Sequence, residues 1–66
     1  MAVIKVIEIM SNSKKSWEDA VAKGVAKASE SVKNIRSASV QHQSCVVDSG
    51  KIKEYRVNLK VSFEVK

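Results

Sequence analysis

The chain has 66 residues with one cysteine and one histidine, and 12 lysine and arginine residues against 7 acidic ones give a net charge of +5. These counts exclude an intrachain disulfide and a four-ligand zinc site within one chain, and no run of about 18 apolar residues predicts a membrane span. A chain this short buries only ~60% of its unfolded surface, so we expect one domain, residues 1–66, stabilised by association with other subunits.

The first predicted element is a strand over residues 3–10, which is rich in Val and Ile. Lys5 and Glu8 are its charged residues, and they interrupt the apolar core that a signal peptide needs. We therefore expect a cytoplasmic protein, in a compartment where Cys45 stays reduced. Residues 11–13, Ser-Asn-Ser, are typical of a turn.

A helix is predicted over residues 17–32. Ser16 is the expected N-cap, with Asp19 completing a loose capping box, and Ser13 is an alternative cap. Gly24 costs helix stability, and its place on the apolar stripe predicts a close approach of the helix to a sheet. The residues that recur at helical spacing and form this stripe are Trp17, Ala20, Val21, Gly24, Val25, Ala28 and Val32.

A second strand is predicted over residues 35–47, followed by a hairpin turn at residues 48–51 in which Gly50 supplies a positive φ. Strict alternation divides this strand between two faces. One face is expected to hold Ala38, Val40, His42, Ser44 and Val46. The other is expected to hold Ser37, Ser39, Gln41, Gln43, Cys45 and Val47, and it is unusually polar.

The third predicted strand, residues 52–66, alternates strictly between apolar and polar residues. Fifteen residues at ~3.3 Å each span roughly 50 Å, about twice the width of a compact domain of this length. The strand should therefore extend beyond its own domain and pair with a neighbouring subunit. A right-handed crossover makes the first two strands parallel and leaves the third between them. We expect an α+β fold, β-α-β-β, with a three-stranded antiparallel sheet of order 1-3-2 cupping one helix.

Several segments together resemble the dodecin family over essentially the whole chain. They are Lys5-Val6-Ile7-Glu8-Ile9, Ser13 with Ser16-Trp17-Glu18-Asp19-Ala20, Ala26-Lys27-Ala28, Val32-Lys33-Asn34-Ile35, Gly50-Lys51-Ile52, Tyr55-Arg56-Val57 and Val61-Ser62-Phe63. The resemblance implies a homododecamer that stores a small-molecule ligand and has no enzymatic activity. Its implied cofactor is a flavin, riboflavin or FMN, held at subunit interfaces.

The resemblance places the flavin site on Ser37 and Arg56, where flavin-binding dodecins carry a stacking Trp and a ring-edge Gln. Ser39 occupies another position that is aromatic in some relatives. A serine offers no aromatic plane, so these replacements argue against high-affinity flavin binding of the usual type. Arg56 offers two alternatives, since its flat guanidinium can contact a flavin or a phosphate, or form a cross-strand salt bridge.

The chain is similar to a second branch, the calcium dodecins, which have a Trp at the position of Trp17 and lack the strand Trp. The alternative function is therefore a non-flavin dodecamer that binds calcium, whose ligands the sequence does not place. Trp17, His42 and Cys45 are interpreted as structural residues, because none has the neighbours that a catalytic site needs. Nucleic-acid binding is a third, less favoured hypothesis, since the basic residues are scattered among only three aromatics.

Overall fold

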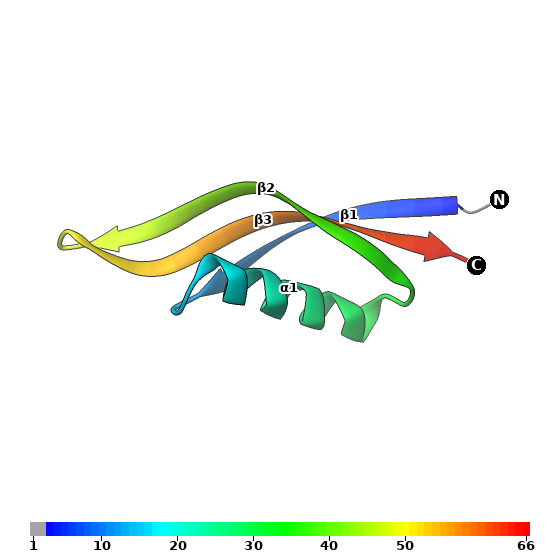
Figure 1. Cartoon of the computed structure of the whole chain (residues 1–66), viewed down its shortest axis with the longest axis horizontal. Helices are drawn as coiled ribbons and strands as arrows, with labels where there is room; N and C mark the ends of the chain where they lie inside the picture. Colours follow the sequence, from blue (N-terminus) through cyan, green and yellow to red (C-terminus); the bar gives the residue numbers. More distant parts are fainter. Residues whose placement is uncertain (1–2) are drawn as a thin grey trace.

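The computed structural model describes residues 3–66 and contains one helix packed on a three-stranded sheet (Figure 1). The elements are β1 (Val3–Ser13), α1 (Trp17–Ser31), β2 (Ile35–Asp48) and β3 (Lys51–Val65). β3 lies in the centre and pairs antiparallel with both β1 and β2, so the strand order is β1-β3-β2. The predicted fold class is therefore confirmed. In these residues no helix is long and apolar enough to cross a membrane.

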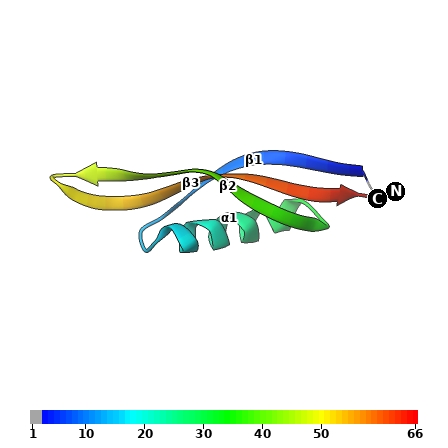
Figure 2. The same ribbon diagram turned by 45° about the horizontal axis from the view of Figure 1, so that its top comes forward.

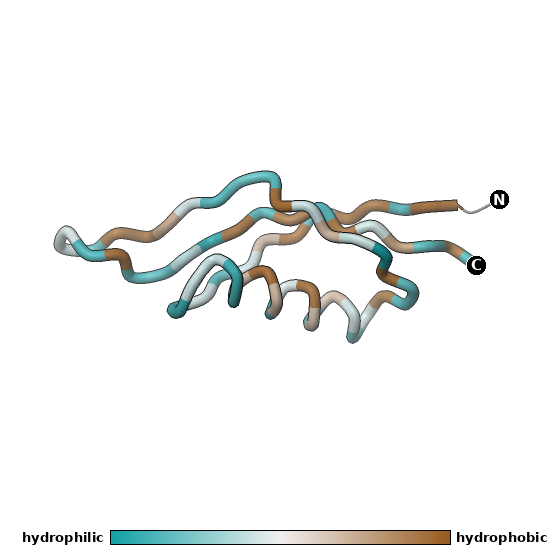
Figure 3. The backbone as a smooth tube through the Cα atoms, viewed as in Figure 1, coloured by the Kyte–Doolittle hydropathy of each residue, from teal (hydrophilic) through white to brown (hydrophobic). Residues whose placement is uncertain are grey.

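The apolar row of β3 forms the core. Val57, Leu59 and Val61 are fully buried beneath α1, together with Ala20 of the helix. The pairs Ile7–Val61 and Ile9–Leu59 extend this row into β1. The tube in Figure 3 shows that apolar and polar residues alternate along much of β3. Because successive side chains of a strand point to opposite faces, one row lies under the helix and the other on the opposite face.

Gly24 lets α1 approach the sheet closely, as the sequence predicts. A Cβ at this position would lie 3.0 Å from Leu59 Cδ1 and 3.1 Å from Ser11 Cβ, both tighter than ordinary van der Waals contact. Ser11 belongs to a strand and Leu59 is fully buried, so a Cβ at position 24 would have to displace the strand or a core side chain. The glycine therefore sets how near the helix axis lies to β1 and β3.

The β2–β3 hairpin extends well beyond the helix, at the end of the molecule opposite the two termini (Figures 1 and 2). Its two-residue turn uses left-handed backbone at Ser49, with φ 53°, and Gly50, with φ 77°. The chain measures 51 × 19 × 14 Å, and its radius of gyration is 13.5 Å. A compact chain of this length would have a radius near 11 Å. The predicted overhang is confirmed.

The first strand runs three residues further than the sequence indicates. The segment from Ser11 to Ser13, predicted as a turn, continues β1 and pairs with Val57, Arg56 and Tyr55 of β3. The turn prediction was wrong because β3 is long enough to offer backbone partners to these residues. Serine and asparagine are typical of turns, but they also fit at a strand end beside a helix start.

Truncation of the most central side chain tests how much the core row contributes. Leu59→Ala should lower the free energy of unfolding by about 2–5 kcal/mol, because a fully buried leucine loses its contacts and leaves a cavity. The measurement is urea denaturation at one fixed protein concentration. Leu59→Met, which nearly conserves volume, is the control and should cost less than about 1.5 kcal/mol. Equal losses for the two variants would contradict this assignment of the core.

Candidate functional site

The sheet has a face that α1 does not cover, which we call the outer face. Cross-strand partners share a face, so the register identifies its residues. β3 contributes Arg56, Asn58, Lys60, Ser62 and Glu64, and β1 contributes their partners Asn12, Met10, Glu8, Val6 and Ile4. β2 adds Ser37, Ser39, His42 and Ser44, opposite Ser62, Lys60, Asn58 and Arg56. The outer face is therefore mostly polar, with an apolar strip along β1.

Both predicted site residues, Ser37 and Arg56, lie on this outer face. The hydroxyl of Ser37 hydrogen-bonds the hydroxyl of Ser62 across the β2–β3 pair. Arg56 Nε donates a hydrogen bond to Asn12 Oδ1 at 3.1 Å. Ser62 lies six positions after Arg56 on β3, which is roughly 20 Å along a strand. A single subunit therefore places the two residues on one face without bringing them together, and a shared pocket would need a second subunit.

The predicted division of β2 into two faces was wrong beyond Val40. The register shifts between Val40 and His42, so Val40 pairs with the buried Leu59 whereas His42 pairs with Asn58 of the outer face. From there on the faces are exchanged, with Ser44 outside opposite Arg56 and Cys45 opposite Tyr55. An irregularity of this kind adds a residue to one strand and reverses the alternation that follows.

The three aromatic residues of the chain all lie on the helix side of the sheet. Trp17 packs edge-on against Tyr55, with ring centroids 4.9 Å apart, and its Nε1 donates to the carbonyl oxygen of Ser44 at 2.9 Å. Phe63 pairs with Lys5 and Ile35 in the row beneath the helix. The outer face, as far as residues 3–66 define it, offers no aromatic plane. Trp17 contacts the core, as its place on the apolar stripe predicts.

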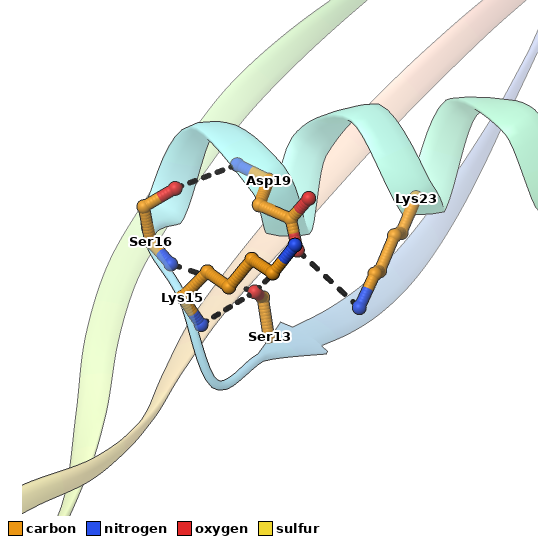
Figure 4. A network of polar contacts seen from close by, with 5 residues as sticks. All are labelled: Ser13, Lys15, Ser16, Asp19 and Lys23. Atoms are coloured by element: carbon orange, nitrogen blue, oxygen red, sulfur yellow. Dashed lines mark hydrogen bonds and ion pairs between the residues drawn. The ribbon is translucent and has the colours of Figure 1, made fainter.

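A polar network fixes the junction between β1 and α1 (Figure 4). The buried Ser13 hydroxyl donates to Asp19 Oδ2 at 2.6 Å and accepts from the backbone N–H of Lys15 at 2.9 Å. Ser16 caps the helix by accepting from the backbone N–H of Asp19 at 3.0 Å, as predicted. Lys23 lies 3.3 Å from the same carboxylate. The hydrogen bond from Ser13 is the main cause that lowers the pKa of Asp19, and Lys23 adds to it.

The remaining candidate residues do not form a catalytic or metal-binding cluster in one subunit. His42 and Cys45 are exposed, and the register places them on opposite faces of β2. Across residues 3–66, no three His, Cys, Asp or Glu side chains gather closely enough to hold a metal ion. Among the carboxylates of the strands, Asp48 pairs with Lys53 and Glu64 with Arg36. Glu8 and Glu54 form no ion pair with the described part of the chain.

Comparison with known proteins gives a consistent result. The family model described as Dodecin matches residues 3–66. The calcium dodecin of Mycobacterium tuberculosis is 49% identical over 67 residues, which cover 100% of this chain and 93% of that protein. A crystal structure of calcium dodecin from the same organism, described as a calcium-chelating immunodominant antigen with a novel calcium-binding site, aligns with a TM-score of 0.84 over 97% of this chain and 91% of its own.

Two further solved structures share the fold at lower sequence identity. A dodecin variant from T. thermophilus is 24% identical, with a TM-score of 0.94 over 100% of this chain and 98% of its own. The dodecin from Streptomyces davaonensis is 23% identical, with a TM-score of 0.94 over 98% of this chain and 96% of its own. At these identities the comparison shows likeness of fold alone.

The junction network predicts a specific pH dependence of stability. The pKa of Asp19 in the folded protein lies below its usual value of 3.8, so its ionised form stabilises the fold above that value. As the pH falls through the lowered folded pKa, the carboxylate is protonated and this contribution disappears. Asp19→Asn should therefore be less stable than wild type at pH 7, and the difference should shrink below pH ~3.8.

The measurement is the denaturant midpoint of wild type and Asp19→Asn between pH 2 and 7. Glu18→Gln is the matched control, because it removes a neighbouring carboxylate from the same helical turn that has no hydrogen bond or ion pair within residues 3–66. A difference for Asp19→Asn that stays constant with pH, or that Glu18→Gln reproduces, would contradict the role of the Ser13–Asp19 contact.

Proposed function

Because the chain belongs to the dodecin family, we propose that it is a non-enzymatic binding protein that assembles as a homododecamer and binds calcium between its subunits. The observation that carries the choice of ligand is the 49% identity to a calcium dodecin across the full length of this chain.

The shape of the subunit supports self-assembly. Its accessible surface is 4858 Å², whereas a compact protein of the same mass exposes roughly 4,200 Å². Within residues 3–66, only four apolar side chains are fully buried. Large apolar residues on β1 and on the overhanging hairpin remain exposed, including Val6, Met10, Val47 and Ile52. A subunit with so small a core and so much apolar surface is expected to be stabilised by neighbours.

The distribution of carboxylates agrees with a calcium site that is shared between subunits. Calcium requires six to eight oxygen ligands, and residues 3–66 of one subunit bring no three ligating side chains together. One subunit therefore does not fit the ion by itself. Glu8 and Glu54 are the two strand carboxylates without an ion pair in the described chain, so they are free to contribute oxygens to a site completed by symmetry.

Native mass spectrometry and thermal unfolding test this proposal together. We expect a dodecamer whose mass increases by bound calcium, and a melting temperature that rises with calcium because the ion binds the folded assembly alone. At a calcium concentration 100-fold above the Kd, the gain is about 2.7 kcal/mol. Magnesium is the control, because it tolerates fewer protein ligands and a narrower geometry. Folded monomers, or equal shifts with the two ions, would contradict the proposal.

Flavin binding is a second candidate, and the position of Arg56 favours it. Arg56 lies on the outer face and forms no ion pair within residues 3–66, so its guanidinium plane is available to a planar ligand. Against it stands the absence of an aromatic side chain from the part of that face that the structure describes. We therefore expect the native protein to bind riboflavin or FMN weakly.

Introducing an aromatic plane tests the flavin hypothesis. Ser37→Trp should raise flavin affinity, because an aromatic pair contributes about 0.5–1.5 kcal/mol beyond buried area, a factor of roughly 2 to 13 per stacked face. The measurement is quenching of flavin fluorescence on titration with protein. Ser37→Leu is the control, because it adds apolar bulk without a ring and also removes the bond to Ser62. If the Leu and Trp variants gained equally, or neither gained with assembly intact, stacking at this position would be excluded.

A further inference from the structure

Arg56 occupies a central position on the outer face. It lies on the middle strand β3, between Asn12 of β1 and Ser44 of β2, and it is half-buried. The bond from Arg56 Nε to Asn12 Oδ1, at 3.1 Å, holds one edge of the guanidinium and leaves its two terminal nitrogens free of any hydrogen bond within residues 3–66. The fold therefore orients Arg56 but leaves part of the hydrogen-bonding capacity of its guanidinium unused.

The charge of Arg56 also lacks a counter-ion in the described chain. The other arginine, Arg36, forms an ion pair with Glu64 at 2.8 Å, and no such pair involves Arg56. Glu54 lies two residues earlier on β3 and still forms no ion pair with it. A half-buried guanidinium that lacks an anionic partner forgoes the stronger, charge-assisted hydrogen bonds that it can make.

Several neighbours of Arg56 on the outer face can donate hydrogen bonds. Ser44 lies directly opposite on β2, and the next pair along the sheet is His42 with Asn58. Lys60 follows on β3, opposite Ser39 and Glu8. Lys60 is four residues from Arg56 on the same face, roughly 13 Å along the strand. It forms no ion pair with the described residues, Glu8 included.

We propose that the outer face of β3 binds a compact phosphate-type anion, with Arg56 as its anchor. The free edge of the guanidinium donates two parallel hydrogen bonds to two phosphate oxygens, the geometry that arginine provides and lysine does not. The Ser44 hydroxyl and His42 flank the anion, and Lys60 attracts the far end of a longer one. This site requires no aromatic ring and no calcium, so it is independent of the calcium proposal, although it shares Arg56 with the flavin hypothesis.

The composition of the face selects a small anion over a polymer. Glu54 precedes Arg56 by two residues on β3, and Glu8 of β1 pairs with Lys60. A carboxylate therefore lies at each end of the row from Arg56 to Lys60, and the two repel an extended chain of phosphates. A nucleic acid requires several cations that follow its backbone and shows a steep loss of affinity with salt. The two cations on β3 and the histidine between them fit a phosphate monoester or a diphosphate group.

Isothermal titration calorimetry with inorganic pyrophosphate tests the site on the assembled protein. Calcium-free buffer keeps the result independent of the calcium proposal. Arg56→Gln should weaken binding by about tenfold or more, since a charge-assisted contact of the anchor is lost. Arg56→Lys should recover little of the affinity, because an ammonium ion cannot form the bidentate contact. Orthophosphate should bind more weakly than pyrophosphate, because it does not extend toward Lys60.

Arg36→Gln is the matched control, because it removes the same charge from an arginine that already has a carboxylate partner. It should change the pyrophosphate affinity by less than about twofold, a surface effect of long-range charge. Native mass spectrometry confirms that each variant assembles as wild type does. Equal losses for Arg36→Gln and Arg56→Gln, full recovery with Arg56→Lys, or no heat of binding to the wild type would overturn the proposal.

Discussion

The structure depends on β3, because this one strand contributes side chains to both faces of the sheet. β3 lies in the centre of the sheet, and its inward row of Val57, Leu59 and Val61 supplies three of the four fully buried apolar side chains of residues 3–66. Because successive side chains of a strand point to opposite sides, this inward row fixes the outward row as well. The helix position, the register of both neighbouring strands and the place of Arg56 all follow from this alternation. A slip of one residue would exchange the core for the outer face.

The same strand explains why a single subunit is incomplete. The fifteen residues of β3 are in extended conformation, so the strand is longer than the helix that covers it. The hairpin therefore extends past the core and exposes apolar residues such as Val47 and Ile52 to solvent. Polar contacts then hold the covered part together. At one end, Ser13 and Asp19 join β1 to the helix. Trp17 connects the start of the helix to β2 through a hydrogen bond to the Ser44 carbonyl oxygen. These contacts orient the elements but do not cover the hairpin.

Sequence patterns predicted those parts of the fold that depend on period and on steric need. The strict alternation of residues 52–66 identified the central strand. Gly24 on the apolar stripe predicted a close approach of the helix to the sheet, which the structure places at Leu59 and Ser11. The face assignment of β2 failed beyond Val40, because nothing in a run of Ser, Gln and His marks where a register shift occurs. The turn predicted at residues 11–13 failed because strand length is set by the partner strand, which lies more than 40 residues away in the sequence.

The candidate site was predicted only in part, for a related reason. Alternation alone places Arg56 outside the core, and the resemblance to a family singled out Ser37. The distance between them depends on register, and the pairing of Ser37 with Ser62 sets it at roughly 20 Å. The sequence does not indicate which arginine forms an ion pair, because ion pairs depend on the rotamers of residues far apart in the chain. Arg36 meets Glu64 across 28 positions, whereas Arg56 meets the neutral Asn12 across 44.

The core row leaves the outer row free to vary, since no outward side chain is needed to bury Leu59. A charged residue can therefore stand at position 56 without entering the core, and the chemistry of the outer face can change while the architecture stays the same.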